Sequence, residues 1–198
     1  RQRQMCIRDS IVAGLIPSIS QSFNKNSSAI GQGVTVFTLF FSISAPIFST
    51  ILAKSPVKKI LVIAISVFTL ANIITAISMN YTVYIISRAI AGLGAGVFSP
   101  IAISASNHLV SEKHKGKAIA FTVGGMSVGT VIGVPLGLEI SKLSNWRFAM
   151  LVIIIISFIA LISISILMPK LKIQAPPNLK DRFQLFLNLS LIHISEPT

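Results

Sequence analysis

The stretch NYTVYIISRAIAGLGAGVFSP, residues 80–100, contains a single charged residue, Arg88, among neutral and mostly apolar neighbours. An apolar run of this length is typical of a helix that crosses a bilayer, which needs about 20 such residues. A guanidinium in the middle of a membrane costs on the order of 3 kcal/mol on insertion scales. Arg88 lies roughly 10 Å from the start of its run at 1.5 Å per residue. Because this depth disfavours snorkelling to the surface, we expect Arg88 to face the interior of a helix bundle.

The rest of the chain has the same apolar character. Its 198 residues are 53% hydrophobic and 11% charged, with a mean hydropathy of +0.81, whereas soluble domains carry about 25% charged residues. The runs are too long and too uniformly apolar for the strands of a membrane β-barrel. The sequence therefore predicts an all-α membrane protein, a six-helix transmembrane bundle over residues 11–168. The expected helices are a truncated first helix at 11–20 and full spans at 30–53, 59–79, 82–110, 118–140 and 148–168.

The net charge of +12 is distributed in short basic clusters between the apolar runs. This pattern is typical of loops that set membrane topology, and it excludes a nucleic-acid-binding face, for which no soluble domain is present. Ten basic residues fall in the connections after the second and fourth spans and in the tail at 169–188, against three on the other side. We therefore expect that tail and the N-terminus to be cytoplasmic, in a multi-pass protein of the cytoplasmic (inner) membrane. The ten are Lys54, Lys58, Lys59, Lys113, Lys115, Lys117, Lys170, Lys172, Lys180 and Arg182; the three are Lys25, Lys142 and Arg147.

The two ends of the chain share one coding signature. LSLIHIS, residues 189–195, can be encoded by a DNA string whose reverse complement encodes QMCIRDS, residues 4–10. The string resembles a transposase adapter used to prepare sequencing libraries. We therefore expect residues 1–10 and 189–198 to be non-native tails, which removes Cys6 from any argument about redox compartment. Residues 169–188 would then begin a central cytoplasmic loop.

The segment GGMSVGTVIGVPLG, residues 124–137, places glycine at every fourth position. Residues four apart share one helix face, and small side chains allow two helix backbones to approach closely in a membrane. A proline in the same segment bends the helix. General helix packing is the alternative reading, but four glycines in register favour a specific interface. The residues are Gly125, Gly129, Gly133, Pro135 and Gly137.

No pattern in the sequence points to a catalytic or metal site. Metal-ligand spacings, phosphate-binding loops and nucleophile–base pairs are lacking, so we expect no enzyme activity, no metal and no cofactor. Asn72 and the Ser and Thr residues of the spans are interpreted as packing groups, and His114 as a loop residue. No full span has an acid within its apolar core. The partner of Arg88 is therefore open: backbone carbonyls, water, or a residue outside this sequence.

Taken together, five segments resemble the major facilitator superfamily, in the twelve-span branch of drug:proton antiporters and sugar-efflux proteins. SRAIAGLGAG, residues 87–96, is similar to the family's helix 4 motif, with Arg88, Gly92 and Gly96 at motif positions. Residues 124–137 are similar to its helix 5 antiporter motif. Weaker resemblances are GLIP (14–17) to the end of helix 1, APIFSTILAKSPVKKIL (45–61) to the helix 2–3 turn, and NWRFAM (145–150) to the entry of helix 6.

The helix 2–3 turn departs from the family pattern. Ser49, Ala53 and Pro56 replace the usual glycine, aspartate and second glycine, and Val57 replaces a basic residue. Lys54 and Lys58 fit the pattern, and Lys59 adds a further positive charge. The resemblance implies a charge relay through that aspartate, which Ala53 does not provide.

The resemblance implies the N-terminal half of a twelve-helix transporter, built from two inverted three-helix repeats, with its second half missing. Pro46 and Pro135 fall at similar depths of corresponding helices, as such a repeat requires. The expected function is proton-coupled export of a small molecule (a drug, sugar or metabolite) by alternating access, in which Arg88 serves proton coupling. Its partners would be the substrate, protons and the lipid bilayer. The alternatives are an uptake carrier of the same fold, a fragment without transport activity of its own, a membrane-embedded enzyme, or a non-transporting membrane protein.

Overall fold

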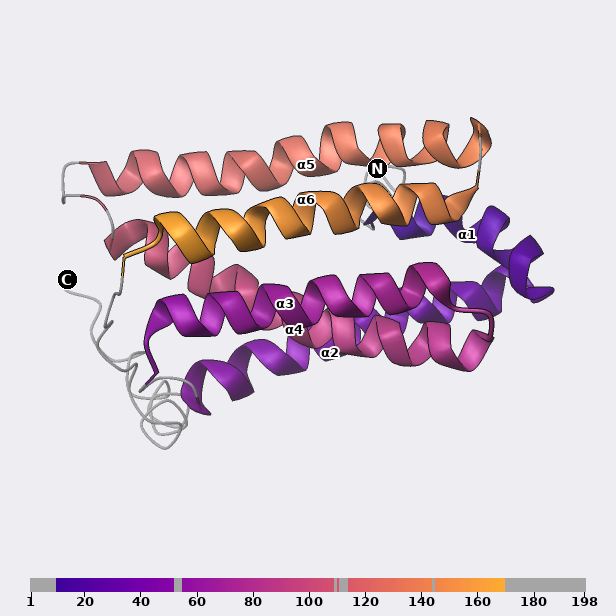
Figure 1. Cartoon of the computed structure of the whole chain (residues 1–198), viewed down its shortest axis with the longest axis horizontal. Coiled ribbons are helices and arrows are strands. Elements are labelled where there is room, and N and C mark those ends of the chain that lie inside the picture. The colour runs from indigo at the N-terminus through magenta and orange to yellow at the C-terminus, as the bar shows by residue number, and fades with distance from the viewer. Residues whose placement is uncertain (1–9, 52–54, 109, 111–113, 144, 170–198) are drawn as a thin grey trace, which may run out of the picture.

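Six helices run along a common direction in the computed structural model (Figure 1). The structure describes residues 10–51, 55–108, 110, 114–143 and 145–169. The tails at 1–9 and 170–198 lie outside the described residues, as does Lys54. They include the expected non-native ends except for Ser10, which begins α1. The helices are α1 (Ser10–Phe23), α2 (Ser27–Ile51), α3 (Val57–Ile77), α4 (Tyr81–His108), α5 (Lys115–Leu143) and α6 (Trp146–Leu167).

The helix ends differ by up to three residues from the ranges expected from hydropathy. The difference arises because hydropathy marks the lipid core, whereas capping residues determine where a helix begins. The Asn26 side chain accepts a hydrogen bond from the Ala29 amide at 3.0 Å before α2. Asn145 does the same for the Arg147 amide at 3.3 Å before α6. Side-chain oxygens of this kind satisfy amides that have no partner within the helix.

Five of these helices are long and apolar enough to cross a bilayer. They are the segments Ser27–Phe48, Val57–Ile77, Tyr81–Ser106, Lys115–Ser141 and Trp146–Leu167. α1 runs beside them but has 14 residues, fewer than a span requires. The described part of the chain is thus an all-α bundle of the multi-pass membrane type.

α4 lies at the centre of one half of the bundle, with α2 and α3 packed on it and α6 on the other side of α3. Successive helices run in opposite directions, so α2, α4 and α6 end at the same side of the molecule (Figure 1, left). Pro46 and Pro135 each lie in the C-terminal half of their helices. The two prolines occupy equivalent positions within their own helices. They lie toward opposite ends of the bundle, because α2 and α5 run in opposite directions.

At the end where α1, α3 and α5 finish, buried side chains from five helices form one cluster. We call it the Trp146 cluster; it contains Leu15, Ile19, Ile30, Ala76, Tyr84, Trp146, Ala149 and Met150. The Trp146 indole nitrogen donates to the Ser22 hydroxyl at 2.8 Å, so its one polar group is satisfied. This cluster fixes the helices relative to one another at that end.

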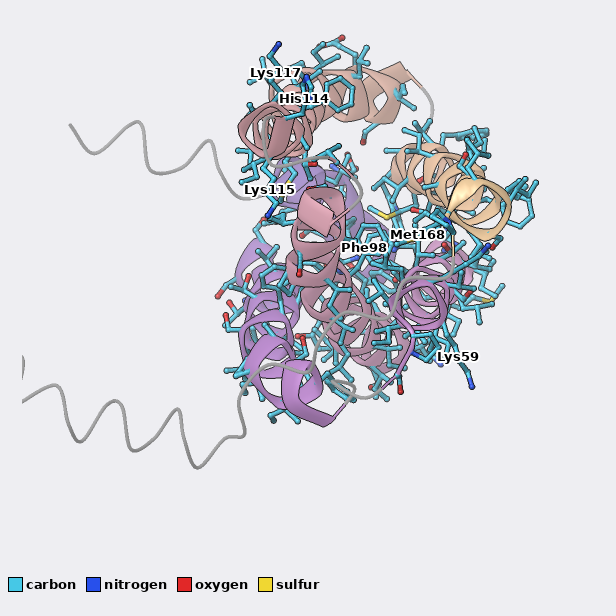
Figure 2. The ribbon with its side chains drawn as sticks, turned by 90° about the vertical axis from the view of Figure 1, so that its left-hand side faces the viewer. Lys59, Phe98, His114, Lys115, Lys117 and Met168 are labelled. Carbon is cyan, nitrogen blue, oxygen red and sulfur yellow. The ribbon has the colours of Figure 1, made fainter. Side chains whose placement is uncertain are left out.

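The opposite end is organised around α3 and α4 and carries the basic residues. Phe98 packs there against Val57 and Leu61, and also against Ile60 and Ala64. Figure 2 views this end along the bundle, with Phe98 near the centre and Lys59, Lys115 and Lys117 at the periphery. The basic connections therefore gather at one end of the bundle, as a positive-inside topology requires.

Candidate functional site

Glycines of α4 bring it into backbone contact with both neighbouring helices. A Cβ atom placed on Gly92 or Gly96 would clash with the carbonyl oxygen of Phe37 or Phe41 on α2. On the opposite face, a Cβ on Gly94 would lie 2.9 Å from the carbonyl oxygen of Ala64 on α3. Both glycines of the helix 4 motif thus contact α2, at separations that only a residue without a side chain permits.

Arg88 lies one turn before these glycines and is enclosed by α2, α3 and α4. Its side chain is 4% exposed. The guanidinium carbon sits 4.7 Å from the centroid of the Phe37 ring on α2, a cation–π geometry. Nη1 donates a hydrogen bond to Asn72 Oδ1 on α3 over 3.4 Å. The expectation that Arg88 faces the bundle interior agrees with this placement.

The contacts of Arg88 leave part of the guanidinium unsatisfied. Nε has no hydrogen-bond partner within the part of the chain that the structure describes, and the 3.4 Å bond to Asn72 is long. Arg88 forms no ion pair with any described residue. A buried charge with one weak neutral partner is energetically expensive. The positive charge of Arg88 is therefore only partly compensated, and its Nε–H can donate a hydrogen bond to a negatively charged or polar group.

Asn72 is held in position to accept from Arg88. Its amide nitrogen donates to the Phe68 carbonyl one turn earlier at 2.8 Å, and its side chain is 1% exposed. The sequence predicts only a packing role for Asn72, whereas the structure places it in contact with Arg88. The sequence does carry one signal of this contact: polar residues recur at every third position of α3 and its C-cap, at Thr69, Asn72, Thr75 and Ser78.

A second polar contact joins α3 and α4 at the residue that precedes Arg88 on α4. The hydroxyls of Thr75 and Ser87 are 2.8 Å apart and both buried. Each hydroxyl also lies within hydrogen-bond distance of a backbone carbonyl in its own helix. Thr75 pairs with the carbonyl of Ala71, and Ser87 pairs with that of Tyr84. The α3–α4 interface is thus polar around Arg88 and apolar nearer the basic end.

Arg147, counted among the few basic residues opposite the basic end, has a structural role. Its Nη1 donates to the Ala76 carbonyl at 2.7 Å and its Nη2 to the Ser78 carbonyl at 2.9 Å. A cation at a helix C-terminus stabilises the last carbonyls and the helix dipole. Arg147 therefore binds the start of α6 to the end of α3, which the sequence alone did not predict.

The glycine positions of α5 do not share one environment. Gly125 and Gly129 are exposed, and a Cβ on either would meet no atom within 4 Å. Gly133 is half-buried, Pro135 is exposed and Gly137 is buried. The 18-residue apolar core of α5 contains no buried residue, against half of the residues for α3. The structure thus leaves the first part of this face uncovered, and it does not bring the face to Arg88.

The helix 2–3 turn contributes Lys58, half-buried, and Lys59, exposed. Figure 2 shows the Lys59 side chain directed away from the bundle. His114 is exposed at the start of α5, in agreement with a surface position. Among the described residues, no group of three or more His, Cys, Asp or Glu side chains is arranged to hold a metal ion.

A bundle with five membrane-spanning helices and one guanidinium buried among them defines a polytopic membrane protein with an intramembrane charged site. A family model described as the Major Facilitator Superfamily matches residues 5–195, and the chain belongs to that family.

Curated relatives agree with this assignment. The chain is 28% identical over 176 residues to the uncharacterized MFS-type transporter YbcL of Bacillus subtilis, covering 89% of this chain and 45% of the relative. It is 30% identical over 183 residues to YtbD of the same organism, covering 92% and 46%. It is 23% identical over 167 residues to the inner membrane transport protein YdhP of Escherichia coli, covering 84% and 43%. The chain thus spans about half the length of the curated relatives it matches.

Proposed function

We propose that this chain forms the N-terminal half of a secondary transporter that exports a small molecule across the cytoplasmic membrane in exchange for protons. Arg88 carries the proposal. It is a buried, incompletely satisfied charge on α4, and ionisable residues inside membrane bundles mark ion or proton pathways. Family membership supports a secondary transporter, and the helix 5 resemblance favours export over uptake.

In the proposed mechanism the guanidinium responds to a titrating group rather than titrating itself, because arginine stays protonated. An acid supplied by the rest of the transporter binds the free Nε–H when ionised and leaves it when protonated. Phe37 and Asn72 hold the guanidinium between α2 and α3, so a change in its partner alters the packing of both helices on α4. Rocking of two halves around a site at the midplane then exposes the substrate to alternate sides.

The test uses the intact transporter in everted membrane vesicles with a respiration-driven proton gradient. Ethidium, chloramphenicol and a thiogalactoside serve as probe compounds, and acridine orange reports the gradient. Proton-coupled export predicts that a transported probe dissipates the gradient and accumulates in everted vesicles. Arg88→Ala should abolish both responses at equal membrane abundance. Arg88→Lys should also be impaired, since an ammonium lacks the planar fork of a guanidinium.

Two results would contradict the proposal. Accumulation of a probe in right-side-out vesicles, driven by an inward proton gradient, would identify an uptake carrier. Gradient-driven transport by Arg88→Ala at the wild-type rate would exclude a coupling role for this residue.

A further inference from the structure

An opening lies at the basic end of the bundle, where α2 and α3 diverge over α4. Both helices pack on α4 rather than on each other along their described lengths. The opening has a volume of about 420 Å³, within the range of about 300–1,000 Å³ found for small-molecule sites. Phe48 of α2, Val67 of α3 and Val97 of α4 are among the side chains that line it.

Polarity is confined to one end of this opening. Ser55 and Lys59, at the start of α3, are its polar lining side chains, and the others are apolar or glycine. Lys59 and Val67 are eight residues apart on one helix, so the opening extends about 12 Å from the basic end toward the bundle centre at 1.5 Å per residue. That depth is close to one leaflet of a hydrocarbon core about 30 Å thick.

The opening faces outward rather than toward Arg88. Ile63, which lines it, is 52% exposed, and Lys59 points away from the bundle (Figure 2). No described residue covers Ile63 fully, so an acyl chain can reach the opening from the outer surface of the bundle. Lys59 forms no ion pair with any described residue, and a lysine at this level attracts anionic headgroups.

We propose that this opening is a binding site for an anionic phospholipid, whose headgroup phosphate contacts Lys59 and one of whose acyl chains lies between α2 and α3 against α4. The positive charge of Lys59 favours an anionic headgroup. The apolar lining, which extends about as deep as one leaflet, accommodates the acyl chain. The bound chain fills the space beneath Phe48 and next to Gly94, where α3 and α4 are in backbone contact. The site is separate from Arg88 and does not depend on transport.

Native mass spectrometry of the purified protein in mild detergent tests this site. Phosphatidylglycerol and phosphatidylcholine with identical acyl chains are added separately, and the single-lipid adducts are quantified. We expect phosphatidylglycerol to bind about 5-fold more tightly, the effect of roughly one lysine near an anionic headgroup. Lys59→Gln should reduce phosphatidylglycerol binding to the phosphatidylcholine level. Lys117→Gln, an exposed lysine at the same end that does not line the opening, should leave it unchanged.

A second pair of variants tests the acyl-chain part. Val67→Phe fills the opening and should reduce binding of both lipids, whereas Val131→Phe, at a position 70% exposed on α5, should not. Equal binding of the two lipids, or equal loss in Lys59→Gln and Lys117→Gln, would overturn the headgroup assignment. Unchanged binding by Val67→Phe, or weak binding of both lipids because another part of the chain fills the opening, would overturn the site. Because lipid adducts are counted without transport, a failure here is distinguishable from a failure of the proposed exporter function.

Discussion

At the scale of single residues, the guanidinium of Arg88 has two contacts and one unpaired hydrogen-bond donor within the described part of the chain. Phe37 and Asn72 hold the guanidinium at 4.7 Å and 3.4 Å, and Nε remains unpaired among the described residues. A site that is stable but not electrostatically complete can gain or lose a charged partner during a cycle. A fully paired arginine could do so only by breaking an existing ion pair.

The Arg88–Asn72 contact should be measurable as a coupling energy. We expect Asn72→Leu to lower the thermal stability of the purified protein, because it removes the hydrogen-bond acceptor of a buried guanidinium. Arg88→Met removes that poorly compensated charge and should leave the stability unchanged or raise it. In the Arg88→Met background, Asn72→Leu should therefore cost about 1–3 kcal/mol less than it does alone. Thermal unfolding in detergent, followed by circular dichroism, gives the double-mutant cycle. Additive effects would show that the contact carries no energy.

At the scale of helices, the glycines fall into two groups with opposite requirements. Those of α4 are in backbone contact with α2 and α3, whereas Gly125 and Gly129 of α5 have no neighbour within 4 Å of a Cβ position. Glycine is required by packing in the first group. In the second group, this chain provides no packing reason for it.

Adding one methyl group should distinguish the two kinds of glycine. Gly96→Ala places a Cβ against the Phe41 carbonyl and Ser44, and we expect it to destabilise the protein by roughly 1–3 kcal/mol. The matched control is Gly124→Ala, where a Cβ meets nothing within 4 Å; there alanine should be neutral or stabilising by up to about 1 kcal/mol. Chemical or thermal unfolding of both variants is the measurement. Equal changes in the free energy of unfolding of the two variants would mean that α2 and α4 can move apart without loss of stability.

The open face of α5 should matter only in the complete transporter. Gly129→Leu adds a large side chain where the described chain leaves space, so we expect normal insertion and unchanged stability of this chain. If the face contacts a second half during the cycle, the same variant should block transport by the intact protein. Membrane abundance and probe transport are measured in parallel. Normal transport would show that the glycines are only tolerated by lipid, and degradation would show that the face packs within this half.

At the scale of the whole molecule, the two ends of the bundle are held together in different ways. The end with the Trp146 cluster combines a five-helix apolar core with the Arg147 cap on α3. The basic end has smaller clusters and the opening between α2 and α3. Among the described residues, apolar packing is therefore more extensive at the end opposite the basic connections.

The orientation of the bundle can be tested by cysteine accessibility. Met79, 86% exposed between α3 and α4, should be extracytoplasmic, and His114, exposed before α5, should be cytoplasmic. In intact cells expressing the complete transporter, a membrane-impermeant maleimide should label Met79→Cys but not His114→Cys, and the pattern should reverse in everted vesicles. Labelling of both cysteines from one side would contradict the topology.

The chain ends are tested at the level of the gene. Because residues 4–10 and 189–195 can be encoded by the two strands of one adapter-like string, we predict that the genomic open reading frame lacks residues 1–10 and 189–198 as written. Amplification and sequencing across the locus give the answer. An intact reading frame that contains both tails would refute the prediction.

The sequence by itself determined the all-helical membrane architecture, and it placed the helix ends within three residues of those observed and Arg88 in the bundle interior. These follow from hydropathy and charge, because long, uniformly apolar runs satisfy their backbone in lipid as helices and because a guanidinium facing lipid is costly. The tertiary structure alone decided that Arg88 meets Phe37 and Asn72, that Arg147 caps α3, and that Gly92 and Gly96 are packed while Gly125 and Gly129 are open. The physical reason is that lipid and protein interior are equally apolar. A membrane helix therefore carries little sequence contrast between its two faces, and only the packed bundle shows which face meets which neighbour.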